Sequence, residues 1–310
     1  MVILLTGGTG YLGSNLTKLL CDSNHKVILL KRQSSCIKRL KKISHNLVYY
    51  DVENCDCSKP FNDFGHIDVI IHAATDYGRN SKTEKVLESN VTFPVNLLVN
   101  AIKFNSACFI NTDTYFNTES PICSYLDKYA MSKKLFLEES KKLVRKNNIK
   151  FVNMKLEHVY GAGDSNSKFV NWLFNNLIIN QKELNLTLGE QMRDFIYIDD
   201  VCSAYKNIVK NINKIKKGYT NIPVGSGVPI SIKEFVLNAK KSLNSDTILK
   251  FGAIEYRKNE IFMSCADTEI LNGLGWNCQF SLKEGFIKMK EYHLNTKNKL
   301  LLHNIINTIS

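Results

Sequence analysis

The chain begins with a glycine-rich segment in a setting that strongly limits the possible folds. An apolar run, Val2 to Leu5, precedes Thr6-Gly7-Gly8-Thr9-Gly10-Tyr11-Leu12-Gly13, and an amphipathic run, Ser14 to Leu20, follows it. This order predicts a strand, a tight turn and a helix. Glycines in such a turn let the backbone approach a pyrophosphate, and the helix N-terminus points its free N–H groups at that anion. The segment predicts a dinucleotide site, with candidate residues Gly7, Gly10, Tyr11, Leu12 and Gly13.

The rest of the N-terminal half alternates between buried strands and helices. Apolar runs predict strands at 2–5, 26–31, 46–50, 68–71, 107–111 and 150–154. Amphipathic runs predict helices at 14–20, 34–43, 81–103 and 127–147. Such alternation is typical of a Rossmann-type, doubly wound parallel sheet of the α/β class. We expect residues 1–160 to form an NAD(P)-binding domain.

The alternation stops after about residue 156. Helices are expected at 168–179, 201–212, 231–243 and 281–292, with a short strand at 195–198. We expect a smaller C-terminal α+β substrate lobe made of 161–189 and 213–293, with 190–212 returning to the first domain. Residues 294–310 form a tail, either a loose helix or partly disordered. Ligands of open α/β sheets bind at the C-terminal edge of the strands, beneath such a lobe.

The second predicted strand bears on the choice of cofactor. NAD-specific sites usually place an acidic residue at its end, but this chain has Lys31 and Arg32. Two cations attract a 2′-phosphate, which mildly favours NADP(H) over NAD(H). The alternative is that both side chains are simply exposed. Further candidate cofactor-binding residues follow the third and fourth strands: Asp51, Val52, Ala73, Ala74 and Thr75.

Three side chains point to redox chemistry on a carbinol or ketone. Tyr129 and Lys133 are four residues apart and share one face of a predicted helix. An ammonium near a phenol lowers its pKa, and the lysine can also hold a ribose hydroxyl of the cofactor. Tyr129 could then exchange a proton with the reacting oxygen while nicotinamide carries the hydride. Thr112, at the end of the fifth strand, supplies a hydroxyl that could orient that oxygen.

Composition restricts the partners. The formal net charge is +12, but lysines are spread along the chain and the cluster Lys38 to Lys42 lacks interleaved aromatics, so we expect anionic small substrates and no nucleic acid. Nine cysteines are scattered, and the spacing of Cys55 and Cys57 is not a zinc pattern, so no metal is expected. No run reaches the ~18 apolar residues of a membrane span, and the first strand leaves no room for a signal peptide. We expect no membrane partner and a cytoplasmic protein.

Longer motifs identify a family resemblance. TGGTGYLG, HAAT, NTDT, YAMSK, EHVYGAGD (Glu157 to Asp164) and GEQMRDFIYIDDV (Gly189 to Val201) together resemble the extended short-chain dehydrogenase/reductases, the NAD-dependent epimerase/dehydratase group acting on nucleotide sugars. The resemblance covers residues 2 to about 290. It implies a catalytic triad of Thr112, Tyr129 and Lys133, and a homodimer formed through Lys82 to Phe104 and Lys128 to Lys146. It also implies substrate contacts from Asp76, Tyr77, Asn90, Asp113, His158, Arg193 and Arg257, with the two arginines on the substrate diphosphate.

Details within the motifs narrow the expected reaction. Sugar 4,6-dehydratases of this group carry Thr-Asp-Glu where this chain has Thr112-Asp113-Thr114, so dehydration is not expected. The segments around Asp76, Lys155 and Phe251 look most like the CDP-abequose and CDP-paratose synthase branch. The resemblance thus implies a nucleotide-sugar C4 oxidoreductase of surface polysaccharide biosynthesis, a 4-ketoreductase in preference to a C4 dehydrogenase. A C4 epimerase with tightly held NAD is the alternative, and a cofactor-binding protein without catalysis is a third reading.

Overall fold

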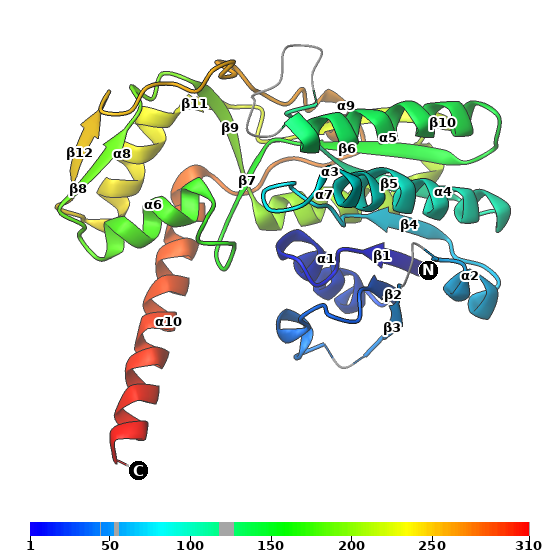
Figure 1. Ribbon diagram of the computed structural model, residues 1–310, viewed down its shortest axis with the longest axis horizontal. Helices are drawn as coiled ribbons and strands as arrows, with labels where there is room; N and C mark the ends of the chain where they lie inside the picture. The colour runs from blue at the N-terminus through cyan, green and yellow to red at the C-terminus, as the bar shows by residue number, and fades with distance from the viewer. Residues whose placement is uncertain (44, 53–55, 118–126, 310) are drawn as a thin grey trace.

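A computed structural model describes residues 1–43, 45–52, 56–117 and 127–309. The chain forms a large parallel sheet with helices on both faces and a second lobe to one side (Figure 1). Seven parallel strands lie in the order β10-β6-β5-β4-β1-β2-β3. Their bounds are β1 Val2–Thr6, β2 Lys26–Lys31, β3 Leu47–Asp51, β4 Val69–His72, β5 Cys108–Thr114, β6 Lys150–Leu156 and β10 Gly218–Val224.

Helices cover the two faces of this sheet, and the sheet separates two apolar core clusters, one on each face. The helix α1 that follows the glycine turn packs against α7 on one face, and α4 packs against α5 on the other. Strands buried on both faces read as continuous apolar runs, which is why 26–31 and 68–71 were recognisable. The helix bounds are α1 Tyr11–Asp22, α2 Lys59–Phe64, α3 Thr83–Leu87, α4 Phe93–Lys103, α5 Asp127–Arg145 and α7 Ile198–Lys210. A π-helical turn, Glu88–Thr92, joins α3 to α4.

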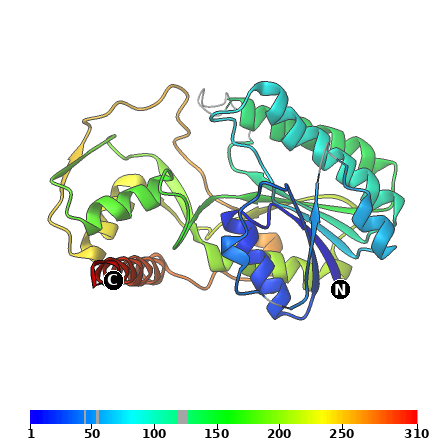
Figure 2. The same cartoon turned by 60° about the horizontal axis from the view of Figure 1, so that its bottom comes forward.

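The second lobe is built on two small sheets, one with the order β11-β9-β7 and one pairing β12 with β8. Figure 2 shows it standing beside the main sheet. Its strands are β7 His158–Tyr160, β8 Glu183–Leu186, β9 Met192–Tyr197, β11 Pro229–Ser231 and β12 Ile248–Phe251. Its helices are α6 Phe169–Ile178, α8 Ile232–Leu243 and α10 Leu282–Ile309, while the short α9 Glu269–Gly273 contacts β10.

The parallel α/β architecture is confirmed, but four local expectations differ from the structure. Residues 218–224, expected within the 213–293 lobe, form β10 at the edge of the main sheet beside β6. In the stretch 190–212, only α7 packs on the first domain, whereas β9 belongs to the smaller sheet. The helix expected at 34–43 is a 3-10 turn, Lys38–Leu40. The helix at 281–292 and the tail at 294–310 are one helix, described to Ile309.

Within the described part of the chain, no helix combines the length and the apolar character that crossing a membrane requires.

Candidate active site

The glycine turn has the geometry of a pyrophosphate cradle. A Cβ added at Gly7 would lie 2.5 Å from the backbone nitrogen of Ala74, and one at Gly13 would lie 2.1 Å from the carbonyl oxygen of Gly7. Gly7 also has a φ of 71°, which side chains disfavour. Helix α1 begins after Gly10 with no side-chain cap, so its first N–H groups remain available to an anion. These residues fit the dinucleotide that the sequence predicts.

The small residues after β4 lie against this turn. The backbone N–H of Ala74 donates a 3.2 Å hydrogen bond to Oγ1 of Thr6, and Oγ1 of Thr6 lies 2.8 Å from Nδ1 of the buried His72. Ala73 and Ala74 therefore line the side of the cradle, whereas Oγ1 of Thr75 donates to Oδ1 of Asn90 at 3.3 Å.

The end of β2 differs from the charge pattern expected of an NADP site. Lys31 forms an ion pair with Asp51, its register partner at the end of β3. Arg32 is exposed, and the backbone N–H of Val52 donates to the carbonyl of Lys31 at 2.8 Å. One of the two predicted cations is thus offset by a carboxylate, and Arg32 alone remains to favour a 2′-phosphate.

Tyr129 and Lys133 come together on the buried face of α5, above the end of β5. Lys133 Nζ donates a 2.9 Å hydrogen bond to the backbone carbonyl of Thr112 and lies 6.0 Å from the centroid of the Tyr129 ring. Burial lowers the pKa of Lys133 to about 8, while the neighbouring Asp113 opposes that shift. Burial also raises the pKa of Tyr129 well above its ordinary value, and Tyr77 and Asp113 add to the increase. The net shift of the Tyr129 pKa is therefore upward in the protein without a bound cofactor or substrate, and the lowering expected from Lys133 stays a prediction.

The two threonines of β5 have different partners. Oγ1 of Thr112 lies 2.7 Å from the hydroxyl of Tyr205 on α7, which is fully buried. The side chain of Thr114 instead hydrogen-bonds Tyr129, and this bond lowers the tyrosine pKa against the effect of burial. Sequence reasoning did not single out Thr114, although its position two residues beyond Thr112 puts both side chains on one face of the strand.

The Tyr77 ring packs against the Tyr129 ring, and Arg79 from the first lobe and Lys168 from the second lobe lie beside Tyr77. The Tyr77 and Tyr129 ring centroids are 5.1 Å apart. Lys168 Nζ lies 5.9 Å from the Tyr77 ring and 6.0 Å from the Tyr11 ring, and it pairs with Asp164 at 2.9 Å.

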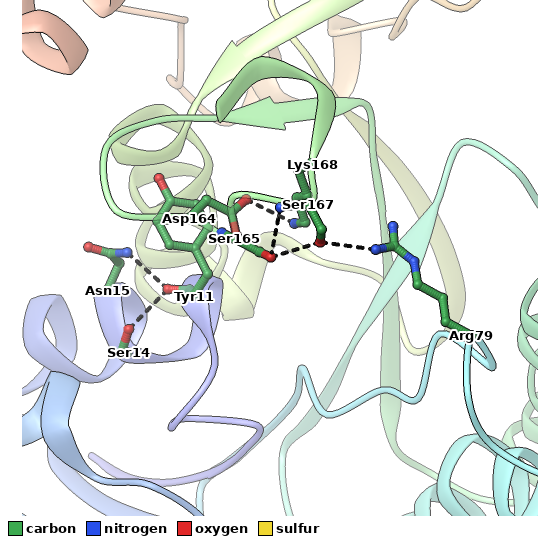
Figure 3. Close-up of polar contacts among 8 residues, drawn as sticks. All are labelled: Tyr11, Ser14, Asn15, Arg79, Asp164, Ser165, Ser167 and Lys168. Atoms are coloured by element: carbon green, nitrogen blue, oxygen red, sulfur yellow. Dashed lines mark hydrogen bonds and ion pairs between the residues drawn. The ribbon is translucent and has the colours of Figure 1, made fainter. Parts of the chain in front are cut away.

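Figure 3 shows Lys168 and Asp164 beside Tyr11, with a second contact between the lobes, from Arg79 Nη1 to Ser167 Oγ at 3.1 Å. Arg79 and Lys168 are cationic residues between the lobes that the sequence analysis did not propose as site residues.

Three of the predicted substrate residues are engaged within the protein. Asn90 is buried and bonds Ser132 and both main-chain groups of Asp76, so it ties the loop after β4 to α5. The carboxylate of Asp76 accepts from Gly78 N and Ser81 Oγ. Asp113 accepts from the amides of Asn153 and Asn117.

The side chain of His158 lies between two aromatic rings. Its ring centroid is 4.2 Å from that of Tyr115 and 5.6 Å from that of Phe195. Burial lowers the pKa of His158 to about 3, and Arg193 contributes, so the ring is neutral at pH 7. Nδ1 of His158 is a buried atom with no hydrogen-bond partner among the described residues, which suits a group that awaits a ligand.

The two arginines predicted to bind a diphosphate occupy different settings. Arg193 on β9 is buried, pairs with Glu260 at 2.5 Å and donates to the carbonyl of Met192. Arg257 is exposed on the irregular segment 252–263, and its backbone carbonyl accepts from the N–H of Glu260. Glu260 therefore connects the segment that carries Arg257 to Arg193. No group of metal-ligating side chains occurs among the residues that the structure describes.

A family model described as the NAD dependent epimerase/dehydratase family matches residues 3–223. The CDP-abequose synthase of Salmonella typhimurium is 33% identical, over 91% of this chain and 95% of that protein. The CDP-abequose synthase of Salmonella muenchen is 35% identical, over 93% and 96%. The solved UDP-glucose 4-epimerase of Thermotoga maritima has the same fold, with a TM-score of 0.81, 20% identity and coverage of 96% of this chain and 99% of that one. The chain belongs to the NAD-dependent epimerase/dehydratase family.

Proposed function

We propose that the protein is a nucleotide-sugar C4 oxidoreductase that reduces a 4-keto group of a nucleotide-activated deoxyhexose or related sugar. One observation supports this most directly. A buried Tyr129 and Lys133 meet at the strand edge beside the glycine cradle, in a chain that matches two CDP-abequose synthases over nearly its whole length. Such enzymes act on small anionic substrates, which agrees with the basic net charge. The setting that we propose is surface polysaccharide biosynthesis.

The protonation state of Tyr129 suits a proton donor. Burial raises its pKa, so the phenol keeps its proton at neutral pH and can deliver it to O4 of the sugar. Lys133, held by the Thr112 carbonyl, is the cation that stabilises the resulting phenolate. The glycine turn of residues 7–13 would hold a nicotinamide dinucleotide, whose chemistry would be the transfer of a hydride to C4. In the reverse direction, the phenolate form of Tyr129 would take the proton from the carbinol.

We propose that a nucleotide diphosphate lies between the lobes, on Arg193 and Arg257. A guanidinium can bind two oxygens of a diphosphate at once. Because Glu260 pairs with Arg193, substrate binding must exchange that carboxylate for a phosphate. The cofactor is NAD(H) or NADP(H). Since Asp51 offsets Lys31, any preference for NADP(H) rests on Arg32.

The function is tested with a panel of nucleotide 4-ketosugars and unmodified nucleotide sugars, each with reduced and oxidised cofactor. With a ketosugar, we expect the absorbance of the reduced nicotinamide at about 340 nm to fall in proportion to the product formed. The product should be heavier than the ketosugar by two hydrogen atoms. Interconversion of two sugars without net change in that absorbance would instead show a C4 epimerase. Turnover of no panel member by a protein that binds cofactor would contradict both.

Tyr129→Phe tests the mechanism on the same panel. We expect kcat to fall by roughly 10²- to 10⁴-fold, since the variant lacks the proton donor, with cofactor binding unchanged. Tyr49→Phe removes a hydroxyl from an exposed position in the middle of β3 and is the matched control, expected to keep full turnover. Unchanged turnover by Tyr129→Phe would refute this role.

A further inference from the structure

The tyrosine that we assign as proton donor lies beneath a second tyrosine. Tyr129 retains only 6% of its surface, whereas Tyr77, on the loop between β4 and α3, is 43% exposed. Their ring centroids are 5.1 Å apart, and the ring planes are inclined by 36°. The exposed ring therefore packs on the outer side of the buried one. A ligand that approached Tyr129 from this side would meet Tyr77 first.

The backbone of the loop is fixed on both sides of Tyr77. Both main-chain groups of Asp76 bond the side chain of Asn90 at 2.8 Å. The Asp76 carboxylate accepts from Gly78 N at 2.8 Å and from Ser81 Oγ at 2.6 Å. Gly78 has a φ of 70°, a conformation that residues with a side chain rarely adopt. Because the backbone is held in this way, Tyr77 can move by rotation of its own side chain between staggered positions, without a rearrangement of the loop.

Two cations, one from each lobe, hold the Tyr77 ring. Arg79 Cζ lies 6.0 Å from the ring centroid, and Lys168 Nζ lies 5.9 Å from it. Both cations are themselves engaged, Arg79 with Ser167 Oγ at 3.1 Å and Lys168 with Asp164 at 2.9 Å (Figure 3). A cation at this distance from an aromatic ring attracts it only weakly. The position of the ring is thus stabilised by several small contacts, which a bound ligand can replace.

We infer that Tyr77 is a gating residue whose ring covers Tyr129 until a sugar takes its place against the phenol. Arg79 and Lys168 hold the ring in the covering position. This inference rests on the proposed function, because it takes Tyr129 as the group that meets the sugar. A keto oxygen receives a proton from Tyr129 only when the two oxygens are within hydrogen-bond distance. Rotation of Tyr77 away from the phenol must therefore precede proton transfer.

The covering role is tested without substrate. The protein is labelled with 3-fluorotyrosine, and the fluorine signal of Tyr129 is identified by its loss in Tyr129→Phe. A neutral, soluble gadolinium chelate broadens the signals of tyrosines that solvent reaches. We expect Tyr77→Ala to increase the broadening of the Tyr129 signal severalfold, whereas Tyr77→Phe keeps the ring and the protection. Tyr49→Ala removes a ring that is 39% exposed on β3 and should change nothing. Equal broadening in wild type and Tyr77→Ala overturns the inference.

The two cations are tested by the same measurement. We expect Arg79→Met to raise the uncovered fraction of Tyr129, and with it the broadening, by about two- to fivefold, the factor that one exposed cation–aromatic contact is worth. Lys168→Met should act in the same direction. Lys233→Met is the matched control, because Lys233 Nζ lies 5.4 Å from the centroid of the Phe251 ring in the smaller lobe. Broadening as in wild type for both Arg79→Met and Lys168→Met would show that these cations do not hold the ring.

The movement itself is followed at Tyr77, whose fluorine signal is identified by its loss in Tyr77→Phe. When the ketosugar that the panel identifies is added without cofactor, we expect this signal to move toward its position in Tyr129→Leu, which has no ring beneath Tyr77. A Tyr77 signal that stays in place while the ketosugar is bound contradicts the gating role. Because the broadening of the Tyr129 signal is read without turnover, a failed gate is distinguishable from a failed reaction assignment, which would appear as an inactive panel.

Discussion

At the residue scale, the ion pair between Lys31 and Asp51 controls the charge that the adenosine end of a cofactor would meet. The pair joins the ends of β2 and β3, with Lys31 largely covered and Asp51 about half exposed. Partly exposed pairs contribute roughly 0.2–1 kcal/mol. Asp51 and a 2′-phosphate would therefore compete for Lys31, and a single substitution can shift that competition.

Asp51→Asn should move the cofactor preference toward NADP(H). The amide cannot neutralise Lys31, so a 2′-phosphate would meet two cations in place of one. We expect the ratio of Kd for NADPH to Kd for NADH to fall by about two- to fivefold, in line with the worth of such a pair. Titrations followed by nicotinamide fluorescence measure both constants. Asp56→Asn, an exposed carboxylate not placed at the strand ends, is the control. An unchanged ratio in Asp51→Asn would show that Lys31 does not face the cofactor.

Some residues of the site were predictable from sequence because their relationship is local. The four-residue spacing of Tyr129 and Lys133 places both on one helix face, and the structure shows both on the buried side of α5. The contact of Thr112 with Tyr205 was not predictable in this way. Tyr205 lies 93 positions further along the chain and reaches β5 only through tertiary packing.

At the element scale, Asp194 on β9 fastens the smaller lobe to the loops that follow β10. Its two carboxylate oxygens accept from Ser226 N at 2.7 Å, Ser226 Oγ at 2.6 Å, Gly227 N at 3.0 Å and Ala266 N at 3.0 Å. The side chain is fully buried. One residue thus satisfies the main chain of two segments, next to the Arg193 that we propose as a phosphate ligand.

Asp194→Asn should destabilise the fold. An amide presents one oxygen, and its NH2 group would face donors that have no acceptor. Hydrogen bonds to a buried charge contribute about 1.5–3 kcal/mol each, so we expect a loss of roughly 2–4 kcal/mol in the free energy of unfolding, measured by urea denaturation. Asp199→Asn removes an exposed carboxylate 3.5 Å from Lys288 and should cost less than about 1 kcal/mol. Equal losses in the two variants would contradict the role of Asp194.

The strand β10 shows why the boundary of the second lobe was not predictable. The alternation of strand and helix ends after β6, and 61 residues separate Leu156 from Gly218. In between, the chain enters the smaller lobe through β7 and returns through α7, so the edge strand looks isolated in the sequence. The predicted sheet therefore had all its strands except this one, which pairs with β6 along seven residues.

At the scale of the whole molecule, the connection between the two lobes depends on Glu157. This residue lies between β6 of the main sheet and β7 of the smaller lobe. Its carboxyl group is buried and accepts a hydrogen bond from Ser264, and its backbone N–H donates to Val224 of β10. Burial raises the pKa of Glu157 to about 7; Asp194 adds to the increase, whereas the bond to Ser264 and the charges of Lys155 and Arg193 oppose it.

This shift predicts a pH dependence of stability with a definite sign. Between the ordinary value of 4.5 and about 7, the folded protein holds a proton on Glu157 that the unfolded chain has released. Raising the pH through that window therefore weakens folding. Relative to Glu157→Gln, we expect the wild-type free energy of unfolding to fall on the order of 2 kcal/mol from pH 4.5 to 7, measured by urea denaturation. Glu183→Gln, at an exposed pair with Lys250, should show no such difference. A constant difference between wild type and Glu157→Gln would contradict the buried proton.

The outer surface of α4 and α5 bears on how two copies could associate. These helices pack side by side on one face of the sheet (Figure 1) and leave large apolar side chains exposed: Val99 at 45%, Met131 at 57% and Leu135 at 40%. Met131 and Leu135 are one helical turn apart, so they form a continuous patch on α5. The family resemblance in the sequence implies a homodimer formed through the same two helices, and we propose that they meet their counterparts in a second copy.

Met131→Glu combined with Leu135→Glu should turn a dimer into a monomer, because two carboxylates on each copy would be brought into an apolar contact and would repel across the symmetry axis. Sedimentation velocity of wild type and variant measures this directly. Leu237→Glu replaces a comparably exposed apolar residue on α8, in the other lobe, and should leave the dimer intact. A variant that remains dimeric would place the interface elsewhere, and a wild type that sediments as a monomer would show that the patch on α5 does not hold two copies together.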